Sequence, residues 1–82
     1  MKSLNLYDVF TNLGECYFSS HQHQKAIQTW LQTREIFEPI AKDFPQYDMG
    51  IHLSISKGYL KVNQLDSTKY YLKTAKRIWE DF

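Results

Sequence analysis

The feature that most constrains the fold of this chain is an internal repeat. When the sequence is shifted by 42 residues, it aligns with itself without a gap. The strongest correspondences pair Tyr17 with Tyr59, Ile36 with Ile78 and Phe37 with Trp79. A period of roughly 20–50 residues is typical of units that stack on one another, because each unit leaves an apolar face that only a neighbour can cover.

The first unit has the apolar spacing of two helices. From Leu4 to Ser19, and again from Ala26 onward, apolar side chains recur at the three- and four-residue steps that line one face of a helix. The polar run at residues 19–24 separates the two stretches and predicts a tight turn. Pro39 is expected to kink or end the second helix.

The second unit repeats this arrangement. Residues 47–60 alternate partly, as a strand would, but Ile51, Ile55 and Tyr59 keep a four-residue step, so we predict a helix. A last helix is expected from Ser67 to about Glu80. The sequence thus predicts an all-α fold with four helices in two helix-turn-helix hairpins. With 82 residues, the chain has room for one domain, with hairpins at about residues 4–43 and 46–81.

The first hairpin also carries a recognisable motif. It reads Phe10-x2-Leu13-Gly14-x2-Tyr17 and then Ala26-x3-Trp30. This pattern resembles the tetratricopeptide repeat family, which implies that the two hairpins stack as a short α-solenoid. The second hairpin departs from the family pattern: His52 stands at its first aromatic position, Ser56 replaces the glycine and Thr68 replaces the alanine. An unrelated four-helix bundle is the alternative.

The period of this chain is about eight residues longer than the roughly 34 residues usual in the family. The extra residues fall between Phe37 and Tyr47, so we expect an extended second helix. Longer repeats of this kind resemble those of the peptide-sensing regulators of Gram-positive bacteria and of kinesin light chains. The resemblance implies a non-catalytic module that binds a protein or peptide, and a regulatory role is one expectation from it.

In this family the first helix of each hairpin lines a groove that receives an extended or helical peptide. The matching positions are Asp8, Thr11, Asn12, Glu15 and Phe18 in the first hairpin and Leu53, Ser54, Lys57, Leu60 and Lys61 in the second. Glu15 and Leu53 stand where members that bind a C-terminal carboxylate have Asn and Lys, so that mode is not expected. Glu15 and Lys57 are expected to face each other across the groove.

Self-association is the alternative function. A solenoid needs about three repeats or a capping helix to cover its last apolar face, and this chain has two repeats. Ile78, Trp79 and Phe82 are therefore expected to contact a second copy, giving a homo-oligomer, or the next repeat of a longer array.

The composition disfavours several other classes of function. Ten basic and nine acidic residues leave a net charge of +1, which gives no long-range attraction for nucleic acid. No apolar run is long enough to cross a membrane, and the N-terminus lacks the pattern of a secretory signal. The single cysteine cannot form an intrachain disulfide, so we expect a cytoplasmic protein.

No group of residues predicts catalysis, a metal site or a cofactor. His21 and His23 share a turn, but no further ligands lie near them in the sequence, so a solvated turn is expected. Cys16 is expected to be a buried, inert thiol that faces a neighbouring helix. His52 is expected to pack in the core or at its rim. The three glycines, Gly14, Gly50 and Gly58, are interpreted as helix-packing positions, not as a phosphate loop.

Overall fold

The computed structural model describes residues 2–81, with side chains from Leu6 to Asp81. The chain forms α1 (Lys2–Ser19), α2 (His23–Phe37), the 3-10 helix η1 (Glu38–Asp43), α3 (Pro45–Lys61) and α4 (Leu65–Asp81). Residues 2–81 contain no strand. The predicted all-α fold with four helices in two hairpins is confirmed. None of the helices described here has the length and apolarity that spanning a bilayer requires.

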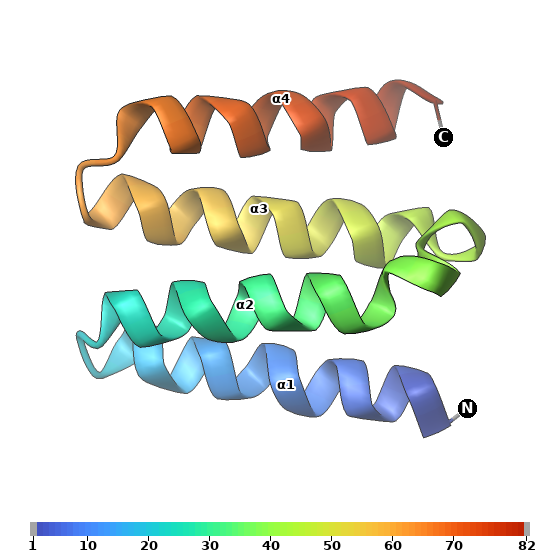
Figure 1. Cartoon of the computed structure of the whole chain (residues 1–82), viewed down its shortest axis with the longest axis horizontal. Coiled ribbons are helices and arrows are strands. Elements are labelled where there is room, and N and C mark those ends of the chain that lie inside the picture. Colours follow the sequence, from blue (N-terminus) through green and yellow to red (C-terminus); the bar gives the residue numbers. More distant parts are fainter. Residues whose placement is uncertain (1, 82) are drawn as a thin grey trace.

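The four helices form a single row in chain order, each antiparallel to its neighbour (Figure 1). Each helix contacts the next one along the chain. The Cα positions extend over 32 × 27 × 15 Å, which makes the molecule a slab. α1 and α4 therefore lie at the two ends of the row (Figure 1).

The turns of the two hairpins have the same backbone geometry. His21 and Asn63, which are 42 residues apart, are the two non-glycine residues with a positive φ in residues 2–81, at 64° and 63°. The backbone N–H that follows each of them donates to a carbonyl five residues earlier: Gln22 to Tyr17 at 2.8 Å and Gln64 to Tyr59 at 2.9 Å. Both turns are thus Schellman-type helix ends. The sequence repeat is a structural repeat.

Trp30 on α2 joins the two hairpins. Its side chain is fully buried in a cluster with Tyr7, Ala26, Ile51 and Ile55, which come from α1, α2 and α3. Its Nε1–H donates to the carbonyl of Thr11 on α1 at 3.2 Å. The core is therefore continuous from the first hairpin into the second.

Two of the three glycines allow this close packing. A Cβ at Gly14 would overlap the Trp30 indole, and a Cβ at Gly58 would lie 2.6 Å from Ile27 Cγ1. At Gly50 the nearest atom would be the Tyr7 hydroxyl at 3.7 Å, an ordinary contact. The helix-packing interpretation therefore holds for Gly14 and Gly58 but is wrong for Gly50.

The expected extension of the second helix is also wrong. α2 ends at Phe37, and the chain continues as η1, which closes with a hydrogen bond of 3.1 Å from the Phe44 N–H to the Ala41 carbonyl. Pro39 has no N–H to donate to the preceding turn, which favours this change to the tighter helix. α4 begins at Leu65, two residues before the predicted start, with Asp66 in its first turn, where a carboxylate is favourable.

Candidate partner-binding site

The residues predicted to line a groove all lie on α1 and α3. Asp8 and Asn12 on α1 are exposed, as are Leu53, Lys57, Leu60 and Lys61 on α3, while Thr11, Glu15, Phe18 and Ser54 are partly buried. The Thr11 hydroxyl oxygen is enclosed by the protein, so it does not offer a hydrogen bond to a ligand. The other residues leave polar or apolar atoms open to solvent.

Glu15 and Lys57 meet between the two helices. Their Oε1 and Nζ atoms lie 2.8 Å apart, and both side chains are more than a third exposed. The prediction that they face each other is confirmed. An ion pair this exposed contributes only about 0–1 kcal/mol to stability, so a ligand can compete for either partner at little cost.

The ammonium group of Lys57 also lies over aromatic rings. Its Nζ is 4.6 Å from the centroid of the Phe18 ring and 5.4 Å from that of the Trp30 ring. These distances are within the range of cation–π attraction. Lys57 is thus held in place by contacts with α1 and α2, although it is carried by α3.

Two exposed leucines flank Lys57 on α3. Leu53 and Leu60 are 44% and 56% exposed. They precede and follow Lys57 by four and three residues, so all three side chains project from one face of the helix. Seven residues of helix separate the two leucines by about 10 Å along its axis. The site therefore offers two apolar contacts with an ion pair between them.

A shallow depression continues the site along α1. Asn12, Glu15 and Cys16 line it together with Ser19 and Ser20 at the turn. Cys16 is exposed, which corrects the prediction of a buried thiol. The tetratricopeptide pattern implies a neighbouring helix at this position, but α1 is the first helix of the row and no element of residues 2–81 covers this side of it.

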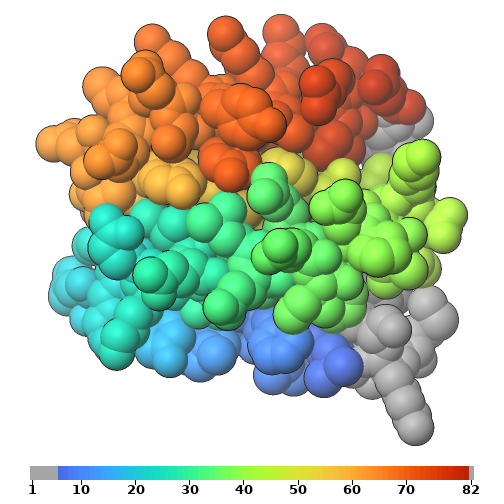
Figure 2. Space-filling model, in the orientation of Figure 1, coloured from blue at the N-terminus to red at the C-terminus, as the bar shows by residue number. Residues whose placement is uncertain are grey.

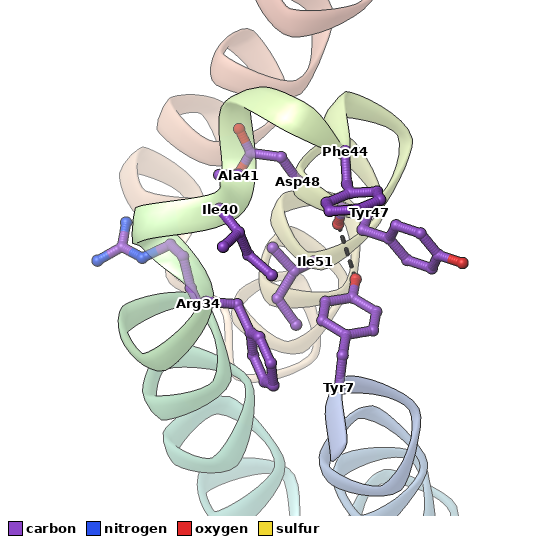
Figure 3. A pocket seen from close by; sticks show the side chains of 9 residues that line it. Tyr7, Arg34, Ile40, Ala41, Phe44, Tyr47, Asp48 and Ile51 are labelled. Carbon is purple, nitrogen blue, oxygen red and sulfur yellow. Dashed lines mark hydrogen bonds between the residues drawn. The ribbon is translucent and has the colours of Figure 1, made fainter. Parts of the chain in front are cut away.

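The sequence did not predict a small, partly enclosed space between the end of α2, η1 and the start of α3 (Figure 3). Its volume is about 20 Å³, enough for about one water molecule. The Tyr7 hydroxyl donates to the Tyr47 carbonyl at 2.7 Å beside it, and burial raises the pKa of Tyr7 to about 12. This space lies at the edge of the core and is too small for an organic ligand.

A second groove lies on the opposite side of the slab, where α3 is recessed between α2 and α4 (Figure 2). Arg34, Arg77 and Tyr70 line it, and the acidic residues Glu38 and Asp48 are also present. The internal repeat does not indicate this groove, because Arg34 and Arg77 do not occupy equivalent positions of the two units. Its mixed charges do not form a site for one kind of ion.

His52 lies in the floor of this second groove. It is buried, and its Nδ1 is 2.7 Å from the Asp48 carbonyl. The ring also packs against Tyr71, with centroids 5.8 Å apart. The interpretation of His52 as a core or rim histidine is confirmed.

The residues predicted for self-association have different environments. Trp79 is exposed on α4, whereas Ile78 is partly buried and lines the α2–α4 groove. Phe82 lies outside the described residues. Trp79 is therefore the one of the three that the structure places at an open surface.

Within residues 2–81, no three His, Cys, Asp or Glu side chains come together as metal ligands would. His21 in the turn after α1 and His23 at the start of α2 have ring centroids 6.0 Å apart. In comparisons with known proteins, no family, no curated protein and no solved structure matches this chain.

Proposed function

We propose that this chain is a tetratricopeptide-like module, without catalytic activity, that binds a peptide segment of a partner protein across α1 and α3. The observation that carries the proposal is the pair of exposed leucines, Leu53 and Leu60, on either side of the Glu15–Lys57 ion pair. Such a surface combines apolar anchors with a polar contact that fixes orientation, as peptide-binding surfaces do.

The chemistry of the site defines the segment it would bind. Two apolar side chains about 10 Å apart would match the spacing of Leu53 and Leu60. An acidic residue between them would compete with Glu15 for Lys57, and the exposed Lys61 one turn further along α3 adds a second positive charge. The proposed ligand is thus an amphipathic segment, helical or extended, with an acidic residue near its centre.

The overall charge and the cysteine content bear on the class of partner and on the cellular compartment. A net charge of +1 favours a protein partner over nucleic acid. A lone, exposed thiol suits a reducing compartment, so we place this activity in the cytoplasm.

Selection of peptides tests the proposal. A displayed library of amphipathic peptides would be selected on the immobilised chain, and the affinities of the selected peptides measured by fluorescence anisotropy. The double substitution Leu53→Ala and Leu60→Ala should weaken binding at least about tenfold, because each buried leucine contributes about 1 kcal/mol or more.

The matched control is Ile36→Ala. Ile36 is as exposed as Leu60 but belongs to α2, so its truncation should leave the affinity unchanged. If the Leu53 and Leu60 double variant binds the selected peptides as tightly as the unmodified chain, the α1–α3 site is not the binding site.

A further inference from the structure

The two ends of the helix row each expose a line of apolar side chains. On α1 the line is Leu6, Val9 and Leu13, which we call the head row. On α4 it is Leu65, Leu72 and Trp79, spaced seven residues apart, which we call the tail row. Both rows follow one side of their helix, the arrangement of a surface that packs against another helix.

The repeat shows how the residues equivalent to the tail row are covered on α2. Leu72 on α4 is equivalent to Trp30 on α2, 42 residues earlier. Leu72 is 46% exposed, whereas Trp30 is 0% exposed because α1 packs against one side of its ring and α3 against another. Among residues 2–81, no helix covers the tail row in the way that α3 covers α2.

The head row shows the complementary half of the same contact. Val9 and Leu13 on α1 are equivalent to Ile51 and Ile55 on α3. Val9 is 60% exposed, whereas Ile51 is 2% exposed and belongs to the same buried cluster as Trp30. The side of α1 that carries the head row therefore corresponds to the side of α3 that packs on α2.

We infer that copies of this chain associate head to tail, with α1 of one copy packed on α4 of the next as α3 packs on α2 within one copy. A single chain carries both halves of this contact at opposite ends, so a second copy is the occupant that supplies each missing half. The inference does not depend on the proposed peptide site.

The charges at the site agree with this arrangement. Glu15 and Lys57 occupy equivalent positions of α1 and α3 and form an ion pair at 2.8 Å. A further α1 placed after α3 would bring the Glu15 of the next copy toward Lys57 from its other side. Acidic and basic residues would then alternate along the stack, with no two like charges adjacent.

The contact between copies would be more polar than the one inside the chain. Ile27 on α2 is equivalent to Lys69 on α4, and Gly58, which meets Ile27, is equivalent to Cys16. Lys69 of one copy would thus lie beside Cys16 of the next. Because the two contacting surfaces differ, the copies would form an open chain or a closed ring. A dimer with two-fold symmetry would need the same surface on both copies.

The first test blocks each end separately. Val9→Lys alters the head row and Leu72→Lys the tail row, both at positions exposed enough to accept lysine in the monomer. By sedimentation velocity, the mass of the unmodified chain should rise with concentration. Each variant alone should remain a monomer, and an equimolar mixture of the two should form a species of two chains and no larger one.

If the mixture of Val9→Lys and Leu72→Lys associates, both variants must be folded. The control Tyr70→Lys, on a different side of α4, should associate like the unmodified chain. A monomeric unmodified chain at every soluble concentration would overturn the inference. So would association of either variant alone to the same extent as the unmodified chain, because a head-to-tail contact requires both rows.

The second test fixes the direction of packing with a disulfide. A Cβ at Gly58 would lie 2.6 Å from Ile27 Cγ1. In the contact between copies the equivalent positions are Cys16 of one copy and Lys69 of the other. Cysteines at these two positions, made with Lys69→Cys, should therefore have Cβ atoms near the roughly 3.5–4.5 Å that a disulfide needs. Mild oxidation should give a ladder of linked chains on a non-reducing gel. The variant that combines Lys69→Cys with Cys16→Ser should give no ladder. If both the single and the combined variant gave only linked pairs of chains, the head-to-tail direction would be contradicted.

Discussion

At Gly14, the absence of a side chain determines how closely α1 and α2 can pack. A Cβ there would overlap the Trp30 indole, which is fully buried and cannot move aside as a flexible side chain would. Gly14→Ala should therefore lower the free energy of unfolding by about 1–3 kcal/mol despite the better helix propensity of alanine. Urea denaturation followed by circular dichroism measures the change.

Gly50→Ala is the matched control for this prediction. Its nearest neighbour, the Tyr7 hydroxyl, would be 3.7 Å from the new methyl group. Alanine should then stabilise α3 by up to about 1 kcal/mol through its helix propensity alone. Equal effects of the two substitutions would show that Trp30 does not pack against Gly14 as described.

Tyr7 should make stability depend on pH at the alkaline end. Burial raises the pKa of its hydroxyl from 10.0 to about 12 in the folded chain. The folded state therefore favours the protonated form, and this contribution is complete below about pH 10 and is lost as the pH rises toward 12. The free energy of unfolding should fall over that interval.

Tyr7→Phe separates this effect from the ionisation of other groups. At neutral pH the variant should lose about 1 kcal/mol, because the hydrogen bond to the Tyr47 carbonyl is removed. Between pH 10 and 12 its stability should fall less than that of the unmodified chain, in urea denaturation at a series of pH values. Parallel curves would exclude Tyr7 as the source, and the exposed Tyr70→Phe variant should follow the unmodified chain.

At the scale of the elements, the two helix turns are the most regular feature of the repeat. His21 and Asn63 both adopt the left-handed conformation, which costs most residues about 1–2 kcal/mol and asparagine less. His21→Gly should therefore raise the free energy of unfolding by about 1 kcal/mol, and Asn63→Gly by less. Thermal or urea denaturation compares the two, and a larger gain at Asn63 would contradict this account of the turns.

The helices could be predicted from the sequence because their determinants are local. Apolar side chains at three- and four-residue steps indicated all four helices, including the partly alternating stretch around Ile55. The change from α-helix to 3-10 helix near Pro39 was missed. A proline signals that a helix is interrupted, but whether the chain then kinks, stops or tightens depends on what the following residues pack against.

The candidate site was predictable only where the repeat itself carried the information. Glu15 and Lys57 are equivalent residues of adjacent units, so their contact followed from stacking alone. The exposure of Cys16 was not predictable in the same way, because it depends on whether a helix precedes α1 in space. The groove that contains Arg34 and Arg77 depends on the lateral positions of α2 and α4, which no sequence period encodes.

At the scale of the whole molecule, the row of helices separates four surfaces. The side of α1 and α3 carries the exposed leucines and the ion pair, the opposite side carries the α2–α4 groove, and the two ends carry the head and tail rows. Trp30 connects the hairpins beneath these surfaces, since it bonds to α1 and packs against Gly58 of α3. A change at the core should therefore affect both hairpins, whereas a change at one surface need not affect the others.

The measurement that tests the proposed binding function most directly is a titration of the isotope-labelled Val9→Lys variant, expected to be monomeric, with a selected peptide, followed by nuclear magnetic resonance. We predict that the signals that move most belong to α1 and α3, around Phe18, Leu53 and Leu60. Shifts concentrated instead around Arg34, Tyr70 and Arg77 would place the peptide in the α2–α4 groove and contradict the account.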